Sequence, residues 1–208
     1  MAMSESPGTH ITVVLDRSGS MSSVRADTIG GFNTFLARQQ QVAGTATLTL
    51  VQFDHQYEVV YRAVNVREVA PLTEEMFVPR GQTALYDAVG RAVGDTTELV
   101  NGMPADRRPA VVVAILTDGE ENASHEIDHR TVHDLIKQRT AAGWEFLFLG
   151  ANLDVREAAA RIGISAGSAV PFVSSPRGTR GAFDVISARV SASRNSSDRG
   201  RSGPKKIH

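Results

Sequence analysis

The sequence has no cysteine among its 208 residues, which excludes disulfides, thiolate metal sites and cysteine nucleophiles. It also lacks an excess of either charge. The 22 Lys and Arg residues against 23 Asp and Glu give no global electrostatic reason to bind nucleic acid or a membrane surface. No apolar run approaches the roughly 20 residues of a membrane-spanning helix, and the opening MAMSESPGTH lacks the basic and apolar segments of a secretion signal. We therefore expect a cytoplasmic protein that binds neither membranes nor a specific nucleic acid.

Strand-like and helix-like segments alternate along most of the chain. Residues 11–15 and 110–117 are continuous apolar runs, typical of strands covered on both faces. Periodicity and turn signals predict further strands at 45–54, 57–66, 144–150 and 169–173. Helical spacing of apolar residues predicts helices at about 24–41, 84–100, 131–142, 155–162 and 178–191.

This alternation predicts one α/β domain with a doubly wound, mostly parallel sheet and helices on both faces, a Rossmann-like arrangement. The short polar link between 45–54 and 57–66 predicts an antiparallel hairpin, hence one antiparallel edge strand. We expect the domain to cover residues 8–190. Residues 191–208 are basic and rich in Ser, Gly and Arg, without an apolar period, so we expect a disordered tail.

Oxygen-bearing side chains alternate where the first strand ends, in LDRSGSMSS. Residues i, i+2 and i+4 of an extended chain project to the same side, so Asp16, Ser18 and Ser20 can converge on one point. One carboxylate and two hydroxyls form a poor catalytic set. They suit a hard cation such as Mg²⁺, which prefers oxygen ligands and tolerates few carboxylates.

The fourth strand predicted at the centre of the sheet also ends in a carboxylate, Asp118 in LTDGE. If the strand order is 3-2-1-4-5-6, strands one and four flank the crevice at which the order reverses, and ligands bind there. Asp16 and Asp118 would then face each other. Thr83, predicted as the N-cap of the helix that follows it, could supply a third hydroxyl from the same edge.

Together, D-R-S-G-S at 16–20, Thr83 in GQTALYDA and Asp118 in LTDGE resemble the metal-ion-dependent adhesion site of von Willebrand factor A domains. The similarity covers roughly residues 10 to 190. The resemblance implies binding rather than turnover: Ser18, Ser20 and Thr83 would coordinate Mg²⁺ or Mn²⁺, and Asp16 and Asp118 would act largely through water.

The resemblance further implies that an Asp or Glu of a partner protein completes the coordination of the metal. By family analogy, such an adaptor could serve an AAA+ ATPase, a stress-response system or a phage-related assembly. Residues from the loops at that sheet edge are the candidates for the partner-binding rim: Arg17, Arg80, Gln82, Glu120, Glu121, Asn152 and Asp154.

Two metal-dependent hydrolases are the alternatives. His125, Glu126 and His129 spell H-E-I-D-H, which matches the zinc-peptidase pattern HExxH, although it lies in a polar segment that enters a helix. An aspartyl-phosphate phosphatase would use Asp16 as its nucleophile. Such enzymes generally need a carboxylate two residues later as the general acid, and this chain has Ser18 there.

Overall fold

The computed structural model describes residues 8–151 and 154–199, and these contain a six-stranded sheet in the order β3-β2-β1-β4-β5-β6. The strands are β1 (Thr9–Asp16), β2 (Ala46–Phe53), β3 (Tyr57–Asn65), β4 (Ala110–Thr117), β5 (Glu145–Gly150) and β6 (Ala169–Pro171). The helices are α1 (Arg25–Gln41), α2 (Leu85–Asn101), α3 (His129–Ala141), α4 (Val155–Arg161) and α5 (Pro176–Arg199). All neighbouring strands are parallel except the β2–β3 edge pair. The predicted fold class and strand order are confirmed.

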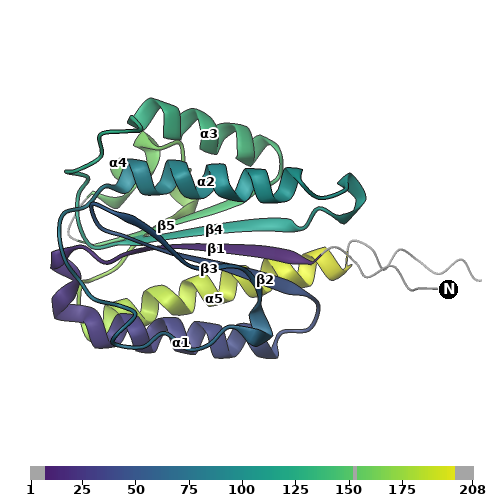
Figure 1. Cartoon of the computed structure of the whole chain (residues 1–208), viewed down its shortest axis with the longest axis horizontal. Helices are drawn as coiled ribbons and strands as arrows, with labels where there is room; N and C mark the ends of the chain where they lie inside the picture. Colours follow the sequence, from purple (N-terminus) through teal and green to yellow (C-terminus); the bar gives the residue numbers. More distant parts are fainter. Residues whose placement is uncertain (1–7, 152–153, 200–208) are drawn as a thin grey trace, which may run out of the picture.

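Helices cover both faces of the sheet (Figure 1). α1 and α5 lie on one face, and α2, α3 and α4 lie on the other. Each face has its own apolar core, one including Phe32 and Phe183 and the other including Val89 and Phe148. β1 runs through the middle, and all eight of its residues are buried. This double covering explains why its sequence reads as a continuous apolar run.

The register of the central strands fixes the position of the candidate site. Leu15 of β1 pairs with Leu116 of β4, so both strands end at the same level. The chain leaves β1 toward β2 and leaves β4 toward β5, in opposite directions along the sheet. The two loops therefore diverge and leave a crevice between them, where doubly wound sheets bind ligands.

The prediction that disorder begins at Ser191 is wrong for residues 191–199, because α5 continues to Arg199. Arg194 is buried, and its guanidinium donates hydrogen bonds to the carbonyls of Gln39, Val42 and Gly44. These groups lie at the C-terminal end of α1, where helical carbonyls lack partners within the helix. This tertiary contact holds a segment that composition alone marks as unstructured. Residues 200–208 of the predicted tail lie outside the described residues.

Within the described ranges, no helix is long and apolar enough to cross a membrane.

The packing of α1 on α5 gives a matched pair of glycine substitutions. A methyl group at Gly31 would lie 2.4 Å from the Phe183 ring, whereas one at Gly30 would meet nothing within 4 Å. We expect Gly31→Ala to destabilise the fold by about 1 to 3 kcal/mol through overpacking. Gly30→Ala should stabilise it by about 0.5 to 1 kcal/mol, because Ala favours the helix. Urea unfolding measures both, and equal effects of the two substitutions would contradict the predicted contact.

Candidate metal centre

The residues predicted to form the metal site converge from three loops at the carboxyl edge of the sheet. Ser18 lies just before a 3₁₀ turn, Gly19–Val24, that leads from β1 to α1, and Ser20 lies within this turn. Their hydroxyl oxygens are 3.1 Å apart. The Ser20 hydroxyl donates a 2.5 Å hydrogen bond to Asp118 Oδ1, across the crevice between β1 and β4.

Thr83 joins this cluster from the segment before α2. A methyl group placed on Gly119 would lie 3.4 Å from the Thr83 hydroxyl and 3.6 Å from that of Ser20, so both hydroxyls border the same glycine. The absence of a side chain at residue 119 thus leaves room beside the Thr83 and Ser20 hydroxyls. The predicted N-cap role of Thr83 is wrong: Ala84 is the N-cap residue of α2, and no side chain caps it. The Thr83 hydroxyl is therefore not used by the helix.

Asp16 supports the centre through hydrogen bonds to residues at the ends of both central strands. It is fully buried, Oδ1 accepts the backbone N–H of Ser18 at 2.6 Å, and Oδ2 accepts the hydroxyl of Thr117 at 2.6 Å. Burial raises the pKa of Asp16 to about 6, against the lowering effect of these hydrogen bonds. The sequence interpretation missed Thr117, the last residue of β4. Its position directly before Asp118 was the one sequence feature that could have indicated its place in the centre.

Asp118 is buried, as Asp16 is. Burial raises the pKa of Asp118, and hydrogen bonds from Ser20 and Ser174 lower it. The Ser174 hydroxyl lies 3.4 Å from Asp118 Oδ2 and belongs to the segment between β6 and α5. Nothing in the sequence marked Ser174, because its approach depends on how β6 and α5 pack.

Arg17 does not lie on the rim, contrary to prediction. Only 4% of it is exposed, and its guanidinium forms ion pairs with Asp54 at 3.1 Å and Glu58 at 2.6 Å. Arg80 forms a second ion pair with Asp54 at 2.9 Å, and its backbone N–H donates to the Arg17 carbonyl. Although burial raises the pKa of Asp54, the hydrogen bonds from Arg80 and Gln56 and the charge of Arg17 lower it below its ordinary value. This network anchors the loop that follows β1 to the β2–β3 hairpin.

The loop between β4 and α3 is braced by two carboxylates. Glu121 accepts hydrogen bonds from the backbone N–H groups of Tyr86, Ala123 and Ser124. Asp87 of α2 accepts those of Glu126 and Ile127 in the same way. Glu121, predicted as a rim residue, therefore also shapes the loop that carries Asp118.

The other predicted rim residues differ in their surroundings. Gln82 and Glu120 are exposed beside the centre. Asp154 is exposed and caps α4, accepting the N–H groups of Arg156 and Glu157. Asn152 lies outside the described residues.

The H-E-I-D-H segment does not form the helical face that zinc ligation requires. α3 begins only at His129, after the N-cap Asp128, so His125 and Glu126 precede the helix. Glu126 forms an ion pair with Arg91 instead. Among residues 8–151 and 154–199, no three His, Asp or Glu side chains are grouped to hold a metal.

The centre at the β1–β4 crevice has a different donor set: three hydroxyls with two carboxylates, all oxygen. Neither Asp16 oxygen is bonded to a cationic side chain of the described chain. Mg²⁺ and Mn²⁺ prefer such oxygen donors. A bound cation would also offset the cost of ionising the two buried carboxylates, so this donor set fits either metal.

Solved structures similar to this chain share its fold. A von Willebrand factor type A protein from Catenulispora acidiphila is 18% identical, with a TM-score of 0.61 over 89% of this chain and 43% of that one. The manganese-loaded TRAP protein of Plasmodium vivax is 13% identical, with a TM-score of 0.61 over 85% of this chain and 72% of that one. The PilB minor pilin from Streptococcus sanguinis is 12% identical, with a TM-score of 0.65 over 93% of this chain and 64% of that one.

No protein-family model and no curated protein sequence matches the chain. The chain spans between about a third and two thirds of the length of the first solved structures that it matches. At these identities the likeness concerns the fold alone, and the chain has a von Willebrand factor A-like fold.

The ion pairs of Arg17 give a second matched pair of substitutions. Asp54 is fully buried, whereas 55% of the Glu58 side chain is exposed. Asp54→Asn leaves a buried guanidinium without its main counter-charge, and we expect a loss of about 3 kcal/mol in the free energy of unfolding. Glu58→Gln should cost less than about 1 kcal/mol, because solvent screens that pair. Denaturant titration tests this, and equal losses would show that burial does not determine the strength of the network.

Proposed function

We propose that this chain binds a divalent cation, Mg²⁺ or Mn²⁺, and through it an Asp or Glu side chain of a partner protein. The observation that carries the proposal is the gathering of the Ser18, Ser20 and Thr83 hydroxyls around Asp118 at the β1–β4 crevice. No other part of the described chain brings such a set of oxygen donors together at the end of two central strands.

The residues of the centre take different roles in this proposal. Ser18, Ser20 and Thr83 would hold the cation directly, and Asp118 would do so through water or through its hydrogen bond to Ser20. Asp16 orients the loop from below, because both of its oxygens are already bonded within the chain. A bound cation would supply an electrophilic position that an external carboxylate can fill, because its direct ligands would be neutral hydroxyls while Asp16 and Asp118 would compensate its charge less directly.

The burial of Asp16 favours binding over phosphoryl transfer. A nucleophilic carboxylate needs a free oxygen that faces the substrate, whereas Asp16 is fully buried with both oxygens accepting hydrogen bonds. The residue two positions later is Ser18, which cannot act as a carboxylic general acid. We therefore propose an adaptor rather than a phosphatase, and an AAA+ ATPase or another multiprotein assembly remains the partner class that the resemblance implies.

The named neighbours support a metal-dependent role by analogy. The TRAP structure is manganese-loaded, and one further neighbour is the pilus adhesin SpaC from Lactobacillus rhamnosus GG, 15% identical to this chain. Those properties belong to those proteins. They support the choice of metal and of a protein partner here without naming the partner.

Calorimetric titration of the metal-free protein tests the metal site. We expect one Mg²⁺ or Mn²⁺ site in the wild type, and at least about tenfold weaker binding in Thr83→Ala and Asp118→Ala, because each removes a donor or a compensating charge. Ser165→Ala is the control: this exposed hydroxyl lies between α4 and β6, and it caps no backbone group. Circular dichroism verifies that the variants fold. Unchanged affinity in both site variants would refute the proposed centre.

A further inference from the structure

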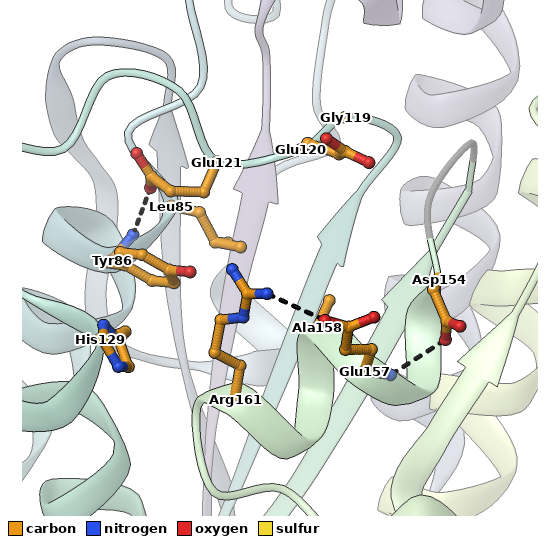
Figure 2. A pocket seen from close by; sticks show the side chains of 10 residues that line it. All are labelled: Leu85, Tyr86, Gly119, Glu120, Glu121, His129, Asp154, Glu157, Ala158 and Arg161. Carbon is orange, nitrogen blue, oxygen red and sulfur yellow. Dashed lines mark hydrogen bonds and ion pairs between the residues drawn. The ribbon is translucent and has the colours of Figure 1, made fainter.

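A pocket of about 370 Å³ (Figure 2) adjoins the candidate metal centre at Gly119. It lies between α2, α4 and the loop that follows β4. Gly119 belongs to its wall and also borders the Ser20 and Thr83 hydroxyls. A partner segment that reaches the metal centre would therefore pass the mouth of this pocket.

The pocket is predominantly acidic. Its walls carry four carboxylates, from Glu120, Glu121, Asp154 and Glu157, against the single guanidinium of Arg161. Arg161 already pairs with Glu157 at 2.9 Å, as Figure 2 shows. The pocket therefore keeps an excess of negative charge.

The carboxylates differ in how far the chain already satisfies them. Glu121 accepts hydrogen bonds from the loop backbone and from the N–H of Tyr86 in α2, and Asp154 accepts two from the start of α4. Glu120 is exposed and has no hydrogen bond or ion pair to another described residue. The Tyr86 side chain also belongs to the wall, but it already interacts with Arg161. Glu120 is thus the group that offers a binding position for a cationic side chain.

We propose that this pocket binds a Lys or Arg side chain of the partner, located within about two residues of the acidic residue that reaches the metal. The inference rests on the proposed function. The spacing follows from Gly119, which touches both sites, and from the reach of about 3.5 Å per residue of an extended chain. A bound cation would attract a carboxylate and the pocket is negative, so a neighbouring acidic and basic residue would match both at once.

The same arrangement disfavours strongly acidic partners. A second carboxylate beside the first would face Glu120 and the other pocket carboxylates, and like charges in contact oppose binding. The pocket therefore gives selectivity that the metal alone, which accepts any accessible carboxylate, cannot give.

A library of short peptides with one fixed Glu and randomised flanking positions tests the inference, with selection on the wild type in Mg²⁺ and in EDTA. We expect Mg²⁺-dependent capture with Lys or Arg enriched at one flanking position. Glu120→Gln should weaken the binding of a selected peptide about two- to fivefold, the size of one exposed ion pair. Glu120→Lys should remove the basic preference or invert it toward Asp and Glu.

Glu98→Gln is the matched control, because Glu98 is an exposed glutamate near the C-terminal end of α2, away from the pocket. It removes the same charge and should leave both affinity and preference unchanged. Mg²⁺-dependent capture of acidic peptides without a basic preference, or with one that Glu120→Lys leaves intact, overturns the pocket inference and leaves the proposed function standing. Absence of any Mg²⁺-dependent capture of the acidic peptides overturns both.

Discussion

The buried carboxylate of Asp16 joins the two central strands at the edge where the candidate centre lies. One oxygen accepts the hydroxyl of Thr117 at the end of β4, and the other accepts the N–H of Ser18, where the chain turns out of β1. These two bonds fix the start of the loop that follows β1 relative to Asp118. Without them, nothing in the parallel pairing of β1 and β4 would dictate how the chain leaves the sheet.

The neighbouring residue secures the loop on the opposite side. Asp16 bonds toward β4, whereas Arg17 reaches toward β2 and β3 and pairs with Asp54 and Glu58. The loop is thus held between a strand to either side of β1, by charged groups that burial makes costly to leave unpaired. Such bracing holds Ser18 and Ser20 in place, which would reduce the conformational entropy lost if a cation binds as proposed.

The sequence was sufficient for the architecture, because the strands and helices depend on local signals. Apolar runs such as the one ending at Asp16 identified the strands, and the alternation of strands with helices predicted the order that brings Asp16 and Asp118 together. Interactions between distant segments were not accessible in this way. Arg17 looks like an exposed loop residue until Asp54, 37 residues away, is placed beside it. The helical state of residues 191–199 likewise depends on Arg194 reaching the end of α1, more than 140 residues earlier.

The division of charge at this edge connects the centre to its recognition surface. In the proposed function, neutral hydroxyls would hold the cation directly, and a partner's carboxylate would add to the charge compensation by Asp16 and Asp118. In the adjacent pocket, Glu121 and Asp154 hold the loop and α4 in shape. The proposed recognition would therefore use acidic residues that also have structural roles. Since the fold is shared with proteins as different as a pilin and TRAP, the fold does not determine a partner, and in the proposed function selectivity would come from these surroundings.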